Sequence, residues 1–590
     1  MNLSSFSARL RWCVAVFALA ACPAWAASSF DLWGEAFAAQ WMRLSPERST
    51  AAQYFTGAEQ DELDGQLSPP ELERRQRQRA LASEGLAQID IFTAGTLTPS
   101  QQIDAATMRW SLQRSLAGMP FEDHGFAFNQ LNGLQVNAVN FLTQTHPMRR
   151  PGDVQTYLAR LRQLPARLDD TVARARRSAE RGLLPPRFVL ERARTQVEQF
   201  LAPAAADNLF VSALAERTAS MASLDGAQRQ QALMQAQVLV AEQVRPAYQR
   251  VLDLLNALHP RTNGDAGLWR LPDGAAAYQQ ALASNTTTAL TADEIHAMGL
   301  RELARIEAEM DRVLTGLGRI EGSVSQRMRT LSAESQLPAE PDPRPMILAR
   351  YDEYIRAAER RAAPLFKLKP TAPVEVRRVP ALIERTASAY YTTPAPDGSR
   401  PGIFWVPLPG PVFNVMGMRS LAVHEAVPGH HFQLALQQEQ LDLPRWRQLR
   451  VFSGGSAHSE GWALYAERLA IDEGWYEGDP HSLLGALGAQ LFRARRLVVD
   501  TGLHAKRWTR QQSIDYGIEA SEVERYVANP GQATAYMVGM LRILALREEA
   551  RTTMGARFSL PGFHDIVLRA GSVPLDVLGD LVRRWATGPW

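Results

Sequence analysis

Residues 424–431 read His424-Glu425-Ala426-Val427-Pro428-Gly429-His430-His431, and the interpretation of the whole chain starts from them. They hold three of the chain's 11 histidines. A His-Glu pair followed one helical turn later by a second His is typical of zinc-binding helices. The two imidazoles bind the metal from one helix face, and the Glu takes a proton from bound water. The stretch predicts a lengthened zinc motif, because Pro428 occupies the position four residues after His424.

Pro428 decides which later histidine can be the second ligand. In a regular helix His430 would lie about 240° around the axis from His424, and His431 would lie about 10.5 Å along it. A proline ring collides with the carbonyl four residues earlier, and Gly429 adds backbone freedom. We therefore expect the helix to bulge here and to return a later histidine to one turn's distance. We choose His430, since a Gly-His pair ends shorter zinc motifs. His431 then packs nearby or reaches substrate.

A third protein ligand is expected from the segment 459–467, which reads Ser-Glu-Gly-Trp-Ala-Leu-Tyr-Ala-Glu. Zinc in a catalytic site takes three protein ligands and keeps one position for water. A helix that returns antiparallel to the first places Glu460 against the histidines. Glu467 lies two turns further on the same face, where its carboxylate can orient an imidazole. The alternative for this whole cluster is a buried network of hydrogen-bonded polar side chains that binds no metal.

Two segments just before the histidines have the pattern of short strands. Residues 373–380 alternate valines with charged side chains, and residues 402–408 include Ile403-Phe404-Trp405-Val406. We expect a small antiparallel β element beside the zinc helix, with an edge at which a substrate backbone can pair. A structural hairpin that covers the core is the alternative. Tyr390 and Tyr391, before the second strand, are candidates to line the cleft.

The remaining chain is helical in pattern, with apolar side chains every three to four residues. The predicted helices cover 59–95, 153–182, 228–258 with a break at Pro246, 291–317 with a capping box of Thr291 and Glu294, and 344–365. Turn signals mark a seam over 260–290. We expect a mostly α, large two-lobed multi-helix fold, with an N-terminal helical lobe over 27–275 and a catalytic lobe over 276–590.

The first 26 residues have the features of a secretion signal. Arg9 and Arg11 precede the apolar run 12–21, and Ala24-Trp25-Ala26 resembles a signal peptidase site. The alternative is a lipoprotein signal over 1–21, with a lipid on Cys22. Either processing predicts an exported, periplasmic protein, soluble or lipid-anchored, whose contact with a membrane is limited to that lipid. Both cysteines lie in the leader, so the mature chain has no internal disulfide.

The net charge of the chain bears on which partners it can bind through long-range electrostatic attraction. The chain has 64 Lys and Arg against 62 Asp and Glu, a net charge of +2. The two leader arginines account for the excess. This balance argues against nucleic acid or an anionic membrane surface as a partner.

The two motifs together resemble a bacterial family of secreted or lipoprotein metallopeptidase homologues, known as a domain of unknown function. Its mark is His-Glu-x-x-Pro-Gly-His-His followed by Glu-Gly-Trp-Ala-x-Tyr. That family is similar to the gluzincins, the clan of thermolysin, aminopeptidase N, thimet oligopeptidase and the thermostable carboxypeptidases. Residues 459–462 resemble the Asn-Glu-Gly-Phe of aminopeptidase N, whose Glu binds zinc. The resemblance runs from about Trp41 to the C-terminus, and only the length of the histidine motif departs from the clan.

Two later segments match the pattern of the same family. Gluzincins place a Tyr or His opposite the zinc to stabilise an oxyanion, and the resemblance makes Tyr536 our candidate, with a core tyrosine as the alternative. Arg525 either binds a substrate carboxylate or forms a structural salt bridge. His504 either contacts substrate or pairs with Asp500 to fix its helix.

We therefore predict a zinc-dependent, gluzincin-like peptidase that cleaves short peptides in the periplasm. His424, His430 and Glu460 hold Zn²⁺, and Glu425 takes the proton of the attacking water. Short peptides are expected by analogy with the deep cleft of related folds. The rivals are a zinc hydrolase of non-peptide amides and a catalytically silent peptide-binding protein.

Overall fold

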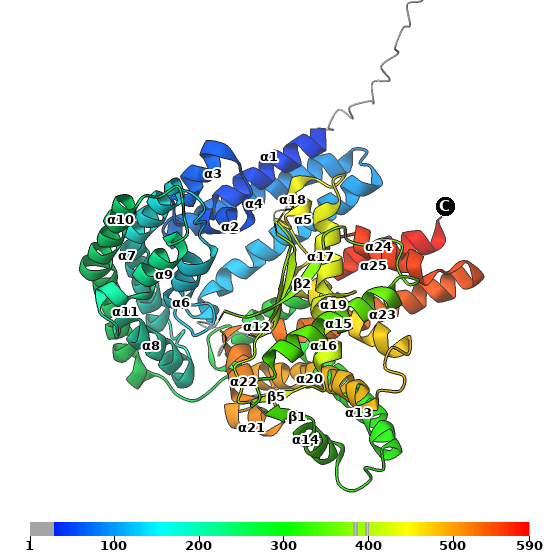
Figure 1. Cartoon of the computed structure of the whole chain (residues 1–590). Coiled ribbons are helices and arrows are strands. Elements are labelled where there is room, and N and C mark those ends of the chain that lie inside the picture. Colours follow the sequence, from blue (N-terminus) through cyan, green and yellow to red (C-terminus); the bar gives the residue numbers. More distant parts are fainter. Residues whose placement is uncertain are drawn as a thin grey trace, which may run out of the picture.

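The computed structural model describes residues 29–338, 340–380, 384, 388–395, 398 and 400–588. Figure 1 shows a large multi-helix body with a few short strands, as the sequence predicts. The predicted leader, with Cys22, lies outside the described residues. Among the helices that the structure describes, none combines the length and the apolar character that a membrane crossing requires.

The helices follow one another along the chain, and the long connection over 363–417 holds the strands β2 (Val374–Arg378) to β5 (Val412–Asn414). The first eleven are α1 (Ser29–Arg43), α2 (Pro46–Ala52), α3 (Gly57–Asp64), α4 (Glu71–Ala94), α5 (Pro99–Gly118), α6 (Leu134–Asn140), α7 (Pro151–Glu180), α8 (Arg187–Leu201), α9 (Leu209–Thr218), α10 (Gly226–Leu239) and α11 (Arg245–Leu258). The next seven are α12 (Gly274–Thr286), α13 (Ala292–Gly316), α14 (Val324–Glu334), α15 (Arg344–Ala362), α16 (Met418–Glu425), α17 (His430–Glu439) and α18 (Arg445–Gln448). The last are α19 (Gly455–Asp472), α20 (Pro480–Ala505), α21 (Arg510–Asp515), α22 (Ala520–Ala528), α23 (Ala535–Met554), α24 (Leu560–Arg569) and α25 (Leu575–Thr587).

Local sequence signals account for several helix ends. The Thr291–Glu294 capping box is present: the Thr291 amide donates to the Glu294 carboxylate at 2.8 Å, and the Glu294 amide donates to Thr291 Oγ1 at 3.3 Å. A π-helical turn at Val240–Val244 interrupts the predicted helix just before Pro246. The prediction of a single helix over 59–95 is wrong, because the segment forms two helices. Pro69 and Pro70 separate α3 from α4, because proline lacks the amide that a helix interior needs.

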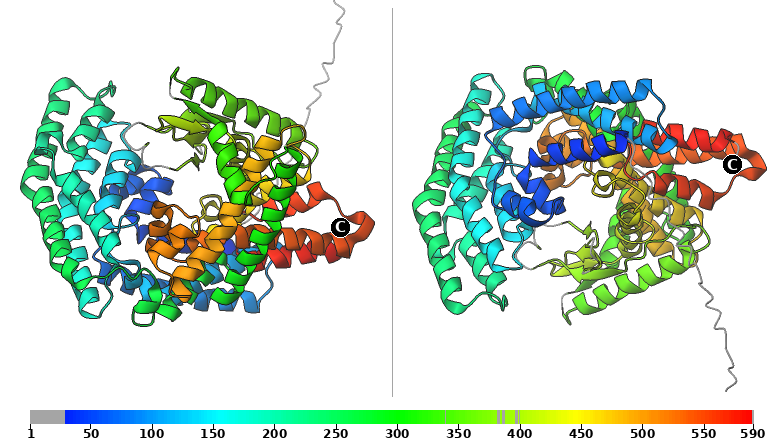
Figure 2. Two further views of the ribbon diagram at one scale, coloured as in Figure 1. Left: turned by 90° about the horizontal axis from the view of Figure 1, so that it is seen from below. Right: turned by 90° about the horizontal axis from the view of Figure 1, so that it is seen from above.

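Four apolar cores hold the helices together. One core lies within α6–α11, which stand side by side at one side of the molecule (Figures 1 and 2). A second joins α1, α4 and α5 to Trp446 and Phe452, far along the chain. The largest core links α12–α17 with α19, α20 and α23–α25. The fourth joins the ends of α20 and α22 to Val189 and Ala266. The lobe boundary near residue 275 stays a prediction.

The strands form two small sheets. The larger has the order β2 (Val374–Arg378), β4 (Gly402–Val406), β3 (Tyr390–Thr392), and β1 (Gln336–Pro338) pairs antiparallel with β5 (Val412–Asn414). An antiparallel pair is present as expected, between β3 and β4. The two segments that the sequence singled out, β2 and β4, run parallel, so the hairpin alternative is wrong. The chain between them is longer than the dozen or so residues that a parallel crossover requires.

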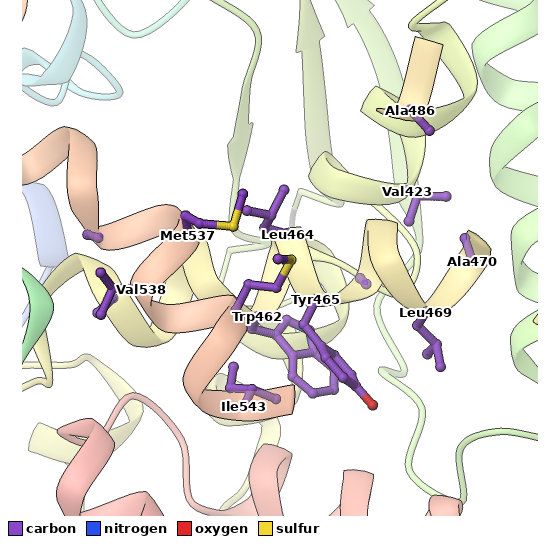
Figure 3. Packing of buried hydrophobic residues seen from close by; sticks show 14 of the residues in the cluster. Val423, Trp462, Leu464, Tyr465, Leu469, Ala470, Ala486, Met537, Val538 and Ile543 are labelled. Carbon is purple, nitrogen blue, oxygen red and sulfur yellow. The ribbon is translucent and has the colours of Figure 1, made fainter. Parts of the chain in front are cut away.

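Helices α19 and α23 touch backbone to backbone at two glycines. A Cβ atom on Gly461 would lie 2.5 Å from the Cα of Gly539, and one on Gly539 would lie 2.0 Å from the Ala457 carbonyl oxygen. Figure 3 shows Trp462 and Tyr465 of α19 packed close to Ile543 of α23. Gly461 follows Glu460 directly, so the contact between α19 and α23 also fixes the position of the Glu460 backbone.

We expect Gly461→Ala to destabilise the fold, because the new methyl group has no space unless one backbone moves. Overpacking of this kind costs about 1–3 kcal/mol or more, so the urea midpoint of the variant should fall. Gly488→Ala is the matched control. It lies inside α20, where the nearest atom to a new Cβ is the Met328 methyl carbon at 4.0 Å, and it should stabilise by about 0.5–1 kcal/mol. Equal midpoints for the two variants would contradict the close contact.

Candidate functional site

The helix that carries His424 stops completely instead of bulging. α16 ends at Glu425, and the backbone leaves the helical region at Ala426 (φ −113°, ψ −95°) and at Gly429 (φ −76°, ψ −127°). The expected bulge within one helix is therefore wrong. Pro428 offers no amide to continue the hydrogen-bond ladder, and a second helix, α17, begins only after it.

The short connection between α16 and α17 is tightly held. A Cβ atom on Gly429 would lie 2.0 Å from the carbonyl oxygen of His424, so only glycine fits there. The carbonyl of Pro428 accepts a hydrogen bond of 2.9 Å from the indole of Trp462 on α19. The break is therefore fixed to the helix that carries Glu460.

This arrangement brings His430 beside His424. Their ring centroids are 4.9 Å apart with an interplanar angle of 84°. Glu460 approaches both rings from α19: its Oε2 lies 3.6 Å from Nε2 of His424 and 3.4 Å from Nε2 of His430. The three ligand atoms all lie within 4.8 Å of one another, and the group is the one set of this kind among the described residues.

The donor set fits a zinc ion. Ligands at the usual 2.0–2.1 Å from a tetrahedral zinc are about 3.3 Å from each other. The two short separations at Glu460 match this spacing closely. Two imidazole nitrogens and one carboxylate oxygen are also ligands that zinc accepts, whereas magnesium and calcium prefer oxygen alone.

Glu467 supports His424 from the side away from Glu460. Its Oε1 lies 2.7 Å from Nδ1 of His424, and its other oxygen accepts a hydrogen bond from the Ser420 hydroxyl. The side chain of Glu467 is only 1% exposed. A carboxylate on Nδ1 keeps the proton there and leaves Nε2 free to bind a metal. The predicted supporting role of Glu467 therefore has the geometry that it needs.

Burial and pairing set the charges of the cluster. Burial acts to raise the pKa of Glu460, but hydrogen bonds from His424 and His430 outweigh it and hold that pKa well below its usual range. Burial acts to lower the pKa of His424, and its hydrogen bonds to Glu460 and Glu467 raise it overall. Glu425 differs, because burial raises its pKa and the nearby imidazoles only partly offset the effect. Glu425 is therefore the strongest proton acceptor among these carboxylates.

These side chains open into a cavity of about 690 Å³. Residues 388–391, at the start of β3, line it together with His424, Glu425, His430 and Glu460. A further wall, from α20, α22 and α23, presents Arg493, Arg496, Glu522, Arg525 and Tyr536. The predicted metal ligands, the predicted base, Tyr536 and Arg525 thus share one cavity.

Arg525 forms the salt bridge that was one of its two predicted roles. Its Nη1 lies 3.1 Å from Oε2 of Glu522, and its Nη2 donates to Gln532. Tyr536 lies under the guanidinium of Arg496, 4.6 Å from the ring centroid. Both residues nevertheless contact the cavity.

Two of the predicted substrate contacts lie elsewhere. His431 is 2% exposed, and its Nδ1 lies 2.8 Å from the Tyr391 hydroxyl, so it supports a cavity residue from behind. His504 is 1% exposed and does not reach the cavity. The Leu268 amide donates to its Nδ1 at 3.1 Å, and its Nε2 lies 3.1 Å from the Tyr526 carbonyl oxygen.

The predicted Asp500–His504 pair is also absent from the described contacts. Asp500 instead accepts hydrogen bonds from the Tyr278 hydroxyl at 2.6 Å and the Gly531 amide at 3.0 Å. Both side chains leave α20 towards segments that are remote in sequence, and each side chain is satisfied there. They fix those segments and take no part in the cavity.

The sequence interpretation missed Arg493, Arg496 and Glu522. A signal existed for the two arginines, because they lie three residues apart in a helix that is otherwise mostly apolar. Charged side chains that recur on one face of such a helix indicate a cavity or a buried pair. Glu522 carries no comparable signal.

Comparison with known proteins gives a family and a fold. The sequence model of a bacterial protein family of unknown function, DUF885, matches residues 46–582. The crystal structure of a candidate lipoprotein from Colwellia psychrerythraea has a TM-score of 0.84 and 32% sequence identity, over 94% of this chain and 99% of that chain. A candidate lipoprotein of unknown function from Shewanella oneidensis gives 0.71 and 20%, over 94% and 100%, which is a likeness of fold. No curated protein matches.

Buried histidines outside the cluster limit the acid stability of the fold. Burial lowers the pKa of five of them to about 4, and these are His146, His431, His458, His504 and His564. In the unfolded chain each titrates near 6.5. As the pH falls from about 6.5 towards about 4, the unfolded chain binds protons that the folded chain does not, so the free energy of unfolding decreases.

His504→Gln should weaken this acid sensitivity. One such histidine adds about 1.4 kcal/mol per pH unit to the slope of stability against pH. Urea midpoints measured from neutral pH down to about pH 4.5 should therefore fall less steeply for the variant. The matched control is the exposed His481→Gln, which removes a histidine without removing a buried one. A slope for His504→Gln equal to that of the wild type would contradict the prediction.

Proposed function

Because the chain belongs to the bacterial protein family of unknown function DUF885, we propose its activity from the site itself: zinc-dependent hydrolysis of peptide bonds in short peptides, in the manner of the gluzincins. The observation that carries the proposal is the convergence of His424, His430 and Glu460 within 4.8 Å, with Glu425 lining the same cavity. Three such ligands leave the fourth position of a zinc ion open, which is typical of catalytic sites.

His424, His430 and Glu460 would hold the metal, and Glu467 would keep His424 in the binding tautomer. A bound zinc would polarise the scissile carbonyl and lower the pKa of water at the open position. Glu425 then takes a proton from the attacking water and passes it to the leaving nitrogen. The water oxygen bonds to the carbonyl carbon as the C–N bond breaks, so one water is consumed and one amine and one carboxylic acid are formed.

Tyr536 is our candidate for a hydrogen bond to the carbonyl oxygen. Its side chain lines the same cavity as Glu425, and Arg496 lies over its ring at 4.6 Å. A hydroxyl that donates to the developing oxyanion stabilises the transition state more than the substrate. The nearby guanidinium also favours negative charge at this end of the cavity.

The edge strand favours a peptide over other amides. The order β2-β4-β3 leaves one side of β3 without a strand partner among the described residues. Residues 388–391, at that edge, line the cavity. An extended peptide can pair with such an edge through its backbone, whereas a non-peptide amide cannot form a ladder.

We also propose that the reaction takes place outside the cytoplasm. The N-terminal sequence has the features of an export signal. Two similar proteins, from Colwellia psychrerythraea and Shewanella oneidensis, are described as candidate lipoproteins. A periplasmic location would give the cavity access to short peptides.

Glu425→Gln tests the mechanism. We expect this variant to retain its metal and to lose hydrolysis by about 10²–10⁴-fold, because an amide cannot accept the proton. Metal content is measured by elemental analysis, and cleavage is measured by mass spectrometry of a peptide-library digest. The exposed Glu473→Gln is the control. Metal-loaded wild type that cleaves no peptide would refute the peptidase proposal, and full activity in Glu425→Gln would refute the role of Glu425.

Glu467→Gln tests the metal centre without any assay of activity. An amide in place of the carboxylate weakens the hydrogen bond to Nδ1 of His424, so we expect zinc affinity to fall about 10–100-fold. The measurement is competition for zinc with a chromophoric chelator. Glu524→Gln is the matched control, since Glu524 is also buried and paired but lies outside the cavity. Equal zinc affinity in the two variants would contradict the supporting role of Glu467.

A further inference from the structure

We propose that Arg496 and Arg525 bind the C-terminal carboxylate of the peptide, so that the enzyme cleaves close to a free carboxyl end. The inference rests on the proposed peptidase function and narrows its substrate class. Both arginines line the cavity of the metal cluster, on the wall formed by α20 and α22.

Arg496 is a rigid and nearly buried cation. Its side chain is 7% exposed. Its Nε donates to the Tyr526 hydroxyl at 3.1 Å, and its Nη2 donates to Glu522 at 2.8 Å. The guanidinium also lies over the rings of Phe492, at 4.4 Å, and Tyr536, at 4.6 Å. A guanidinium held in this way loses little conformational entropy when it binds an anion.

Each arginine keeps a donor for a ligand. Among the residues that the structure describes, Nη1 of Arg496 and Nε of Arg525 form no hydrogen bond. Neither nitrogen is among the fully buried polar atoms that lack a partner, so both can donate to a ligand in the cavity. A carboxylate offers two oxygens and suits guanidinium groups better than a neutral amide.

Among the side chains that line this wall, positive charge exceeds negative charge, and the buried Asp500, whose pKa burial raises to about 7, offsets the excess only in part. Arg496 and Arg525 share a single carboxylate, because both contact Oε2 of Glu522, at 2.8 Å and 3.1 Å. Arg493, the third arginine of the wall, lies 4.0 Å from the Glu467 carboxylate behind the metal cluster. The other carboxylates that line the cavity, Glu425 and Glu460, belong to that cluster. An anionic end of the substrate would therefore be attracted to the Arg496–Arg525 pair.

The cavity opens to solvent, and its volume gives a length scale for the distance between the arginines and the metal cluster. A sphere of 690 Å³ is about 11 Å across, which is the length of about three extended residues. A carboxylate held by the two arginines, with the scissile carbonyl at the metal cluster, leaves room for one to three residues between them. The expected products are thus single amino acids or short C-terminal peptides.

Matched peptides test the inference on the wild-type, metal-loaded protein. One peptide has a free C-terminus, one has a C-terminal amide, and one has a free C-terminus with an acetylated N-terminus. We expect kcat/KM to be at least 10-fold lower for the amide, unchanged by acetylation, and every cut to lie within three residues of the carboxyl end. Equal cleavage of acid and amide would overturn the inference and leave the peptidase function intact. Absence of cleavage in all three would instead refute the peptidase function.

Binding provides a second test that does not depend on turnover. In the Glu425→Gln background, fluorescence anisotropy should show the free-acid peptide bound at least 10-fold more tightly than the amide. Adding Arg525→Gln should weaken binding of the free-acid peptide far more than binding of the amide, so that this difference disappears. Arg510→Gln is the matched control, because Arg510 on α21 pairs with Glu524 on α22, and both residues lie outside the cavity. A preference for the acid that survives Arg525→Gln, or an equal loss in Arg510→Gln, would overturn the inference.

Discussion

The absence of an amide hydrogen on Pro428 is the constraint on which the site depends. Because the helix cannot continue through it, α16 and α17 are separate elements, and their facing ends carry His424 and His430. A regular helix would have pointed these two imidazoles in different directions. The Trp462 indole bond to the Pro428 carbonyl then ties the break to α19. The position of one histidine relative to the other, and of both relative to Glu460, follows from this local interruption.

The buried charged side chains of the cluster are each stabilised by partners of opposite charge or by hydrogen bonds. Glu467, with 1% of its side chain exposed, is balanced by His424, the Ser420 hydroxyl and the more distant Arg493. An unpaired carboxylate at that depth would cost several kcal/mol. The glycine contact lets α19 pack directly against α23. A larger side chain at Gly461 would push the two helices apart and displace Glu460. Packing and electrostatics therefore support the same geometry, and a change in either is expected to disturb the cluster.

The cavity draws its walls from segments that are far apart in the chain. β3 supplies an edge, α16, α17 and α19 supply the cluster, and α20, α22 and α23 supply the arginines and Tyr536. Polar donors, a carboxylate with a raised pKa and a side of β3 that no described strand pairs with meet at one cavity, and this combination supports the proposal of a peptide-binding site. For a family of unknown function, this convergence supports a proposal that is specific enough to test.

The local sequence by itself determined most of the secondary structure and the spacing of the residues in the candidate site. The helices, the Thr291 capping box, the His424–Glu425 pair and the spacing of Glu460 and Glu467 depend on neighbours within a turn or two, and periodicity records such relations. Tertiary structure alone decided the parallel pairing of β2 with β4, the burial of His504 against backbone groups, and the meeting of Arg496 with Glu522 and Arg525. These contacts join residues from separate elements. Their energies come from packing and desolvation in three dimensions, and the pattern of a single segment carries no trace of them.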